Sequence, residues 1–455
     1  MAFVDELAAA LPEGAVVTDS DLLETYRHDR TTWLTPGHPV AAAFPTTTAQ
    51  VADAVKVAAA HRVPIVPRGA GSSLCGGSQA IDGALTLSLE RMDRVLEIDR
   101  PNQAVIVEPG VMNADISAAT SPHGLFYPPD PASKAYCSIG GNIATNAGGL
   151  CCVKYGVTRD YVQRLEVVLA DGSVIETGHD TIKGVAGLDL TGLFVGSEGT
   201  LGIVTRIRLR LRPSPTGTST MVAFFPTLGT AGDAVAAITA SGLQLSLVAI
   251  MDRATVAVVD DYAQMGLDRE AAALLLIQSD SPEPLRRVEV ERAATFCEQA
   301  GASYTAFTDD PDESEALLQA RRLAGPALEA KGELIWDDVG VTRSRIPELL
   351  EAIDLAADRH GASVYTFGHA GDGNMHPTLL VPRGDDDARA AALRAFDDIL
   401  VAALELGGTI TGEHGVGSIK ARFLEREVGS GNLAVQRAIK RTLDPDGLLN
   451  PGRWL

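Results

Sequence analysis

The chain has 455 residues, which at ~150 residues per domain predicts two or three domains. Hydrophobic residues make up 45% of it and charged residues 21%, a balance that excludes a disordered chain and allows a large core. Its 38 basic and 59 acidic residues leave a net charge of −21, which disfavours binding to nucleic acid and to anionic lipid surfaces.

Helical and strand-like patterns divide the chain into four parts. Residues 1–36 contain one short helical segment, at 4–11, and then a polar run. In residues 37–213, short apolar runs alternate with Gly-rich turns and one helix, which predicts a mixed α and β domain. The strand-like runs of this domain are 63–66, 105–107, 165–169 and 202–211, and its helix is 49–61.

A Pro/Gly/Ser/Thr cluster at 213–217 marks a boundary, so a second domain is expected at 214–410. Strand-like runs alternate there with helices, which predicts a second sheet covered by helices. The expected strands are 220–225, 274–277, 334–341 and 363–367, and the expected helices are 229–241, 284–300, 313–330, 346–360 and 386–406. Residues 411–455 are too few for a domain and are expected to dock onto the others through a helix at 432–443.

Targeting and redox signals are few. The N-terminus is acidic where a secretory signal would be basic, and no apolar run approaches the ~20 residues of a membrane-spanning helix. The five cysteines form no C-x-x-C pair, so we expect neither a disulfide framework nor an iron–sulfur or zinc-finger site. The chain is therefore expected to be cytoplasmic, with peripheral association to a membrane electron acceptor left open.

A glycine-rich segment, PRGAGSSLCGG, follows the first expected strand at residues 67–77. Its backbone N–H groups are poorly shielded, and a nest of such groups binds pyrophosphate. A flexible loop is the alternative for this segment taken alone. The spacing does not fit a Rossmann fingerprint, because Leu74 stands at the third glycine position, and no Gly-Lys-Ser/Thr triplet of a Walker loop follows.

Five further motifs follow in order: VEPGV at 107–111, PPDPAS at 128–133, CSIGGNIATNAGG at 137–149, VKYGVTRDYV at 153–162 and GSEGTLGIVT at 196–205. With these motifs residues 37–213 resemble the flavin-binding domain of the vanillyl-alcohol oxidase and p-cresol methylhydroxylase superfamily. Within it the chain is most similar to the FAD-linked D-2-hydroxy acid dehydrogenases, which include the glycolate oxidase flavin subunit and the D-lactate and D-2-hydroxyglutarate dehydrogenases. The resemblance implies an α+β protein with a vanillyl-alcohol-oxidase-type FAD-binding domain and an α+β cap domain with an antiparallel sheet.

The resemblance implies bound FAD, with its pyrophosphate on the loop at 68–73 and 76–77. A flat ring system needs close backbone approach, which glycines permit. The residues that it implies in FAD binding are Pro67, Arg68, Gly69, Ala70, Gly71, Ser72, Ser73, Gly76, Gly77, Pro131, Ser133, Gly140, Gly141, Asn142, Ala144, Asn146, Gly202, Ile203, Val204 and Asn450.

Some relatives attach FAD covalently through a histidine in or near the first loop, but residues 67–79 contain none. We therefore expect noncovalent FAD. Cys75 and the pair Cys151 and Cys152 could be attachment or redox sites, but structural thiols are the favoured interpretation.

Two of the nine histidines, His369 and His376, lie in the motif GHAGDGNMHP at 368–377. Its glycines make a helix improbable, so a turn after a strand at 364–367 is expected to bring both imidazoles toward one point. Glu413 and His414 follow in TITGEHGVG at 409–417. Two histidines and one carboxylate suit Zn²⁺, Mn²⁺ or Fe²⁺. Polar residues near a ligand pocket, with no metal, are the alternative.

The resemblance strengthens the metal hypothesis, since these motifs match those of the metal ligands and the catalytic histidine in the D-2-hydroxy acid dehydrogenases. It makes His369, His376 and Glu413 ligands of a divalent metal, Zn or Mn, and makes His414 the base. In a regular strand neighbouring side chains point to opposite faces, so Gly412 and Gly415 must bend the backbone if Glu413 and His414 serve one site.

Adjacent arginines, Arg321 and Arg322, lie on the helix expected at 313–330. Relatives place a carboxylate-binding arginine at the position that matches Arg321, and the planar guanidinium suits a bidentate contact. Two neighbouring helix residues cannot both face one pocket, so Arg322 is expected on the surface. The Lys and Thr with which D-2-hydroxyglutarate dehydrogenase binds a distal carboxylate fall, by counting, at Trp336 and Gly325. A shorter or more apolar substrate is therefore favoured, although Trp336 could also be plain core.

The expected reaction is FAD-dependent oxidation of a D-2-hydroxy acid (lactate, glycolate or a more hydrophobic analogue) to the 2-oxo acid. Hydride passes to flavin N5, and His414 takes the hydroxyl proton with assistance from the metal. The electron acceptor (a quinone, a cytochrome, an electron-transfer flavoprotein or a separate iron–sulfur subunit) is not identified, and a homodimer is left open. The alternatives are an oxidase that uses O₂ on a related alcohol or hydroxy acid, and a noncatalytic flavin-bearing subunit of an electron-transfer complex.

Overall fold

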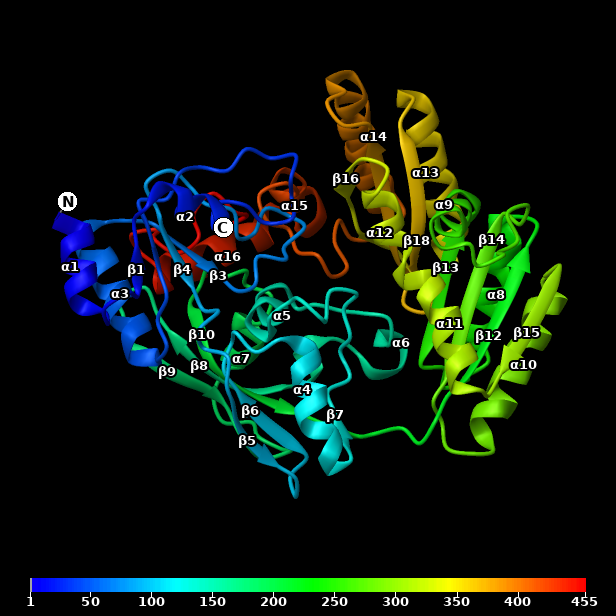
Figure 1. Cartoon of the computed structure of the whole chain (residues 1–455), viewed down its shortest axis with the longest axis horizontal. Coiled ribbons are helices and arrows are strands. Elements are labelled where there is room, and N and C mark those ends of the chain that lie inside the picture. The colour runs from blue at the N-terminus through cyan, green and yellow to red at the C-terminus, as the bar shows by residue number, and fades with distance from the viewer. Residues whose placement is uncertain (1) are drawn as a thin grey trace. The chain divides into compact units, whose positions relative to one another are not determined.

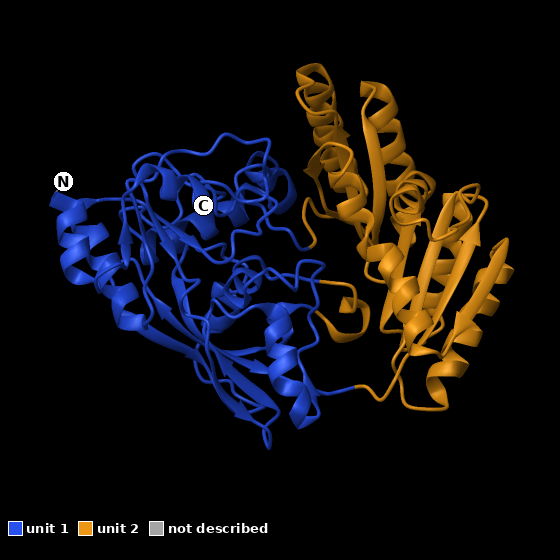
Figure 2. Cartoon of the chain, in the orientation of Figure 1, with its two compact units in different colours: residues 1–148, 157–214, 413–455 blue, residues 149–156, 215–412 orange. Residues whose placement is uncertain are grey.

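A computed structural model describes residues 2–455, which form two compact units (Figure 2). Unit 1 comprises residues 2–148, 157–214 and 413–455, and unit 2 comprises residues 149–156 and 215–412. Residues 149–156 were expected in the flavin domain, but they pack with unit 2, where Leu150 joins a core cluster of that unit. No helix among the described residues is long and apolar enough to cross a membrane.

Unit 1 is built on two larger sheets and one short two-stranded sheet (Figure 1). The first, in the order β1-β2-β4-β3, pairs β4 in parallel with both β2 and β3. The second, in the order β5-β6-β10-β8-β9, is antiparallel, and β7 pairs with β11. The strands of unit 1 are β1 Val16–Val17, β2 Ala41–Ala43, β3 Ile65–Arg68, β4 Leu85–Ser88, β5 Val95–Asp99, β6 Ala104–Val107, β7 Leu125–Phe126, β8 Val162–Val168, β9 Val174–Gly178, β10 Ile203–Arg210 and β11 Arg212–Pro213.

The helices of unit 1 lie around these sheets. They are α1 Ala2–Ala10, α2 Ser20–Thr25, α3 Thr48–His61, α4 Asn113–Thr120, α5 Ile139–Thr145, α7 Leu190–Phe194, α15 Ala421–Val428 and α16 Ser430–Leu443, with short 3₁₀ turns at Ser121–His123 and Thr158–Asp160. The main core cluster joins α1 and α3 to the first sheet through Leu7, Val55 and Leu85.

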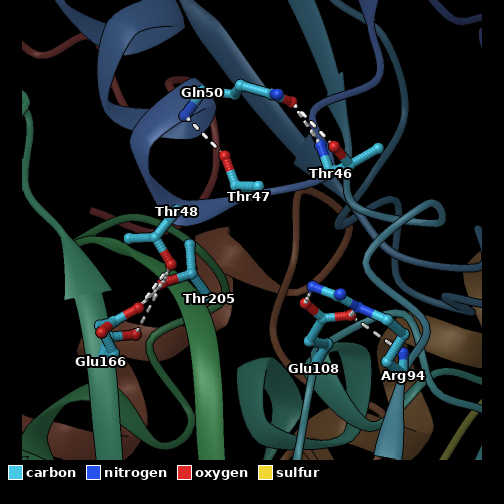
Figure 3. Close-up of polar contacts among 8 residues, drawn as sticks. All are labelled: Thr46, Thr47, Thr48, Gln50, Arg94, Glu108, Glu166 and Thr205. Atoms are coloured by element: carbon cyan, nitrogen blue, oxygen red, sulfur yellow. Dashed lines mark hydrogen bonds and ion pairs between the residues drawn. The ribbon is translucent and has the colours of Figure 1, made fainter. Parts of the chain in front are cut away.

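Polar contacts fix the start of α3, as Figure 3 shows. The Thr47 hydroxyl accepts from the Gln50 N–H at 3.3 Å, an N-cap that satisfies a free donor of the first turn. The Thr48 hydroxyl bonds to Glu166 of β8 and to Thr205 of β10, the latter at 3.1 Å. These contacts join α3 to the second sheet, so the helix links the two larger sheets of unit 1.

Unit 2 contains one antiparallel sheet in the order β15-β12-β14-β13-β18-β19-β16, with β17 paired to β19. Its strands are β12 Ser219–Phe225, β13 Leu247–Asp252, β14 Ala273–Ser279, β15 Tyr304–Thr308, β16 Glu333–Trp336, β17 Val339–Gly340, β18 Ser363–His369 and β19 Asn374–Val381. Its helices are α6 Cys152–Tyr155, α8 Leu228–Ala240, α9 Arg253–Ala263, α10 Leu285–Gln299, α11 Pro311–Arg322, α12 Ala324–Glu329, α13 Ile346–His360 and α14 Asp386–Glu405, with a 3₁₀ turn at Arg343–Arg345.

The central strands β12 and β14 are buried along their whole length, as both faces of a covered sheet require. On one face a core cluster joins α9, α11 and α12 to the sheet, through residues such as Val256, Leu318 and Leu328. Phe367 of β18 belongs to this cluster. Because side chains alternate along a strand, His369 lies on the same face as Phe367.

Candidate functional site

The glycine-rich loop of unit 1 begins where β3 ends, at Arg68. It packs against the start of α5, since the Ser138 hydroxyl accepts from the Ala70 N–H at 3.2 Å. A Cβ atom at Gly69 would lie 2.2 Å from the same hydroxyl oxygen, so a side chain there would displace the Ser138 hydroxyl. The Ser73 hydroxyl turns inward and accepts from Gly77 at 3.1 Å.

The side chain of Arg68 supports this loop from within unit 1. It is buried, its Nη1 donates to the His28 carbonyl at 2.8 Å, and its guanidinium lies 5.9 Å from the Tyr26 ring centroid. Burial lowers its pKa. A Cβ atom at Gly71, where φ is +69°, would lie 2.1 Å from Arg68 Nη2. The Arg68 side chain therefore stabilises the turn from inside unit 1. The backbone N–H groups of the loop remain as the groups suited to binding a phosphate.

The other segments expected to bind FAD join this loop in unit 1. Gly199 packs on Pro67, because a Cβ atom there would lie 3.1 Å from the proline ring. The Glu198 N–H donates to the Ala144 carbonyl at 2.8 Å. The Asn450 side chain donates to the Gly77 carbonyl at 2.9 Å. The loop, α5, the start of β10 and the C-terminal segment thus form one connected group.

Residues around α5 complete that group. Asn142 is buried and accepts from Asn113 at 2.9 Å, while Asn146 ends α5 with φ +53°. The Ser133 carbonyl accepts from the Cys137 N–H at 2.9 Å. The remaining expected residues occupy these same segments: Pro131 is buried before Ser133, Ser72 is half-buried and Gly76 buried in the loop, Gly140 packs on Pro109, Gly141 donates to Ser138, Gly202 directly precedes β10, and Ile203 and Val204 begin it.

The cysteines are all free thiols. Cys75 is buried in the loop, and burial raises the pKa of its thiol, which keeps it protonated. Its Sγ donates to the His414 carbonyl at 3.2 Å. Cys151 and Cys152 are half-buried in the segment that packs with unit 2.

The two histidines of unit 2 lie on the hairpin formed by β18 and β19. The turn expected here occupies residues 370–373, and Phe367 pairs with His376 while His369 pairs with Asn374. This register places both imidazoles on one face of the sheet. Their ring centroids are 5.0 Å apart, and both side chains are buried.

Glu413 follows a stretch that unit 2 holds in place. Asp338, which is fully buried, accepts from the Gly412 N–H at 2.6 Å and from the Thr411 hydroxyl at 3.1 Å. The candidate ligand atoms of His369, His376 and Glu413 all lie within 4.8 Å of one another. Two ligands about 2.1 Å from one ion are at most ~4.2 Å apart, so small side-chain shifts would let the three share it. The donor set therefore fits a divalent metal.

The two adjacent arginines of α11 differ in burial. Arg321 is buried, and its guanidinium carbon lies 4.6 Å from the centroid of Phe367, which is itself 5.9 Å from His376. Arg322 is partly exposed and forms an ion pair with Glu315 on the same helix. Arg321 alone therefore shares the histidine face of the sheet.

Trp336 and Gly325 also meet in this part of unit 2. A Cβ atom at Gly325 would lie 3.0 Å from Cη2 of the indole, which packs edge-on against Phe367 with centroids 6.3 Å apart. The aromatic pair thus lies next to Arg321 and presents an apolar surface.

Two buried carboxylates that contact the motif of His414 were not predicted as site residues. Asp338 accepts hydrogen bonds from Thr411 and Gly412 at the start of this motif. Glu198 accepts from the Val416 N–H at 2.7 Å. Burial raises the pKa of Glu198 to about 7, while the N–H groups of Val416 and Gly417 oppose this shift. The sequence offered one indication of Glu198: it is the only charged residue between Asp189 and Arg206.

Two family models match the chain. The model for an FAD binding domain matches residues 39–178, and the model for the C-terminal domain of FAD linked oxidases matches residues 214–454. The chain is 43% identical to glycolate oxidase subunit GlcD of Bacillus subtilis, over 91% of this chain and 88% of the relative. It is 34% identical to the mitochondrial D-lactate dehydrogenase (cytochrome) of Arabidopsis thaliana, over 92% of this chain and 73% of the relative.

Among solved structures, p-cresol methylhydroxylase with substrate bound superposes with a TM-score of 0.83 at 20% identity, covering 100% of this chain and 96% of that one. This likeness confirms the fold expected from the sequence, a vanillyl-alcohol-oxidase-type FAD-binding fold with mixed helices and antiparallel sheets.

Proposed function

The chain belongs to the FAD-linked oxidases, and on this premise we propose that it oxidises a short or apolar D-2-hydroxy acid to the 2-oxo acid. The proposed substrate is lactate, glycolate or a more hydrophobic analogue. The observation that carries the proposal is the group formed by His369, His376 and Glu413. His414 directly follows Glu413 in the chain.

Arg321 supplies the positive charge that an anionic substrate needs. It is buried, so its attraction for a carboxylate is less screened by water than that of the partly exposed Arg322. Its planar guanidinium can donate two parallel hydrogen bonds to one carboxylate. We assign to Arg321 the binding and orientation of the substrate carboxylate.

His414 accepts the hydroxyl proton in this proposal, since imidazole exchanges protons near neutral pH. Its backbone carbonyl accepts a hydrogen bond from the thiol of Cys75, in the glycine-rich loop at residues 67–77 (the flavin loop). His369, His376 and Glu413 would hold a divalent metal, which when bound makes the substrate hydroxyl more acidic. Residues 37–213 would hold FAD noncovalently, and FAD when bound supplies the hydride acceptor.

The aromatic pair of unit 2 favours a small or apolar substrate side chain. Trp336 lies over Gly325, and neither side chain can form a charge-assisted bond to a second carboxylate. We therefore propose that residues 214–410 bind lactate, glycolate or a hydrophobic 2-hydroxy acid rather than 2-hydroxyglutarate, and that residues 411–455 return to the flavin.

Electrons must then leave the flavin for a separate acceptor. One relative is named as a subunit of glycolate oxidase and another as a cytochrome-linked dehydrogenase. A quinone, a cytochrome, an electron-transfer flavoprotein or an iron–sulfur subunit each fits this role.

The test is anaerobic mixing of the yellow protein with a panel of D and L 2-hydroxy acids, read from the visible flavin absorbance. Rapid bleaching by a D acid with a short or apolar side chain is expected, with slow or no bleaching by the L enantiomer and by 2-hydroxyglutarate. Bleaching by no acid of the panel would favour a noncatalytic flavin-bearing subunit. Admission of air after bleaching distinguishes an oxidase from a dehydrogenase, because only an oxidase reoxidises rapidly. Flavin that stays with acid-precipitated protein would contradict noncovalent binding.

A further inference from the structure

Glu198 lies in unit 1, in the turn between α7 and β10, and is buried with a left-handed φ of +52°. Backbone contacts on both sides fix this turn. Its N–H donates to the Ala144 carbonyl at 2.8 Å, and its carbonyl accepts from the Asn450 side chain at 2.8 Å. The carboxylate is therefore held by the cofactor-binding part of unit 1.

The two carboxylate oxygens of Glu198 accept hydrogen bonds from the backbone that follows His414. Oε1 accepts from the Val416 N–H at 2.7 Å, and Oε2 accepts from the Gly417 N–H at 2.8 Å. Burying a carboxylate is costly unless its oxygens are hydrogen-bonded, and these two charge-assisted bonds offset part of that cost. The geometry matches a carboxylate, which accepts at both oxygens, better than an amide.

Close packing makes this arrangement specific for glycine at two positions. A Cβ atom at Gly415, where φ is +95°, would lie 3.0 Å from Oε1 of Glu198. At Gly417, where φ is +52°, it would lie 2.0 Å from the Cys75 carbonyl oxygen. The turn after His414 therefore fits between the carboxylate and the flavin loop only because these residues lack side chains.

Cys75 contributes two further contacts. Its thiol donates to the His414 carbonyl, and its own carbonyl accepts from the Ser418 N–H at 3.0 Å. Residues 414–418 are thus attached to the flavin loop at their two ends, while Glu198 holds the middle.

We propose that Glu198 is the positioning residue for His414. By fixing the N–H groups of Val416 and Gly417, it sets the backbone from which the His414 imidazole reaches the substrate hydroxyl. The inference rests on the proposed role of His414 as the base. Glu198 itself exchanges no proton with the substrate.

The primary test is Glu198→Gln in the holoenzyme. The amide keeps the shape of the carboxylate but turns an NH₂ group toward one of the two N–H donors, which breaks one bond and adds repulsion. We expect full FAD content, a rate of flavin reduction at saturating substrate about 10- to 100-fold lower, and a KM changed by less than about threefold, because misplacing a reacting group slows chemistry more than binding.

The matched control is Glu108→Gln in the same unit. Glu108 is equally buried, and it binds the Arg94 guanidinium at 2.7 and 3.0 Å, as Figure 3 shows. No contact joins it to the motif of His414 among the hydrogen bonds found for residues 2–455. This variant should reduce its flavin within about twofold of the wild-type rate.

Amide hydrogen exchange gives a readout that is independent of turnover. In Glu198→Gln, the Val416 and Gly417 amides should exchange at least about tenfold faster than in the wild type, since they lose their acceptors. The Glu108→Gln variant should leave both rates unchanged.

Glu198→Gln with bound FAD, wild-type flavin reduction and unchanged exchange at Val416 and Gly417 would overturn the proposal. If this variant does not retain FAD, Glu198→Asp decides, because it keeps both oxygens on a shorter side chain. Slower reduction with FAD bound supports the proposal, and an unchanged rate refutes it. If no 2-hydroxy acid reduces even the wild-type flavin, the proposed function fails, and the exchange experiment alone then tests whether Glu198 holds the turn.

Discussion

The loop at residues 67–77 of unit 1 and the hairpin of β18 and β19 in unit 2 both carry residues expected to bind a cofactor, but they present different groups. The loop presents backbone N–H groups, and its glycines admit Arg68 and Ser138 into close contact. The hairpin presents two imidazoles, whose positions follow from strand register.

This difference decides how each region can fail. A loop whose functional groups are backbone is sensitive to any side chain that displaces it, so we expect cofactor binding there to depend on its glycines. A hairpin held by paired strands tolerates the loss of a side chain without losing its shape, so its chemistry and its fold can be separated. Four predictions test this contrast, in order of expected effect.

The largest effect is expected from His376→Ala. The hairpin should keep its register, because backbone pairing defines it, while the metal site loses one of three ligands. Flavin reduction should fall about 10³-fold with FAD content unchanged. Metal analysis and anaerobic stopped-flow absorbance measure the two properties. The control is His360→Ala on α13, whose imidazole pairs with Asp398 at 2.9 Å; a similar loss of activity there would point to a general loss of structure.

Gly71→Ala should reverse the pattern by weakening FAD binding. The added Cβ would meet the buried Arg68 guanidinium at 2.1 Å, at a φ of +69°. Gly83→Ala is the matched control, since φ is +72° there but nothing lies within 4 Å of the added atom. The control should lose only about 1–2 kcal/mol of stability and bind FAD normally, whereas Gly71→Ala should bind it at least about tenfold more weakly. Flavin fluorescence titration of the apoprotein measures both, and equal affinities would show that the clash is relieved.

Arg321→Lys should lower kcat/KM for the hydroxy acid about 10- to 100-fold, because an ammonium cannot replace a bidentate guanidinium contact. Arg322→Lys should change kcat/KM by less than about twofold, since Arg322 is partly exposed and pairs with Glu315. Steady-state kinetics with an artificial electron acceptor separates the two variants. Equal effects of both would remove Arg321 from the substrate site.

The smallest effect concerns Asp252, which caps α9 by accepting from Thr255 at 2.7 Å and binds the Thr366 N–H of β18 at 2.7 Å. Burial raises its pKa to about 6. Between about pH 4 and 6 the native protein therefore holds a proton that the unfolded chain has released. Its contribution to the free energy of unfolding falls as pH rises, by at most about 1.4 kcal/mol per pH unit.

Asp252→Asn keeps a good N-cap but cannot titrate. The unfolding midpoint of the wild type should thus fall relative to that of the variant from pH 4 to pH 6. Above pH 6 the difference between the two midpoints should stay constant. Chemical denaturation at several pH values measures it, and a difference that is also constant from pH 4 to pH 6 would show that Asp252 titrates normally.

Much of the secondary structure was predictable because local patterns decide it. The helix expected at 49–61 is α3, Thr48–His61, and the helix expected at 346–360 is α13, Ile346–His360. The strand β13, Leu247–Asp252, was not predicted, and the helix expected at 313–330 is divided at Leu323 into α11 and α12. Such boundaries depend on packing in the sheet, which periodicity does not contain.

The sequence alone determined the family motifs, the positions of several helices and strands and the chemical types of the site residues, because glycine spacing and clustered histidines are local properties. The helical pattern excluded that Arg321 and Arg322 both face one pocket, and the tertiary structure shows Arg321 buried against Phe367. It also brought Glu198 onto the backbone of Val416 and Gly417, across 218 and 219 positions of the chain. Contacts at such separations depend on how sheets and turns pack, and a buried acid shows its partner only when the fold brings the two together.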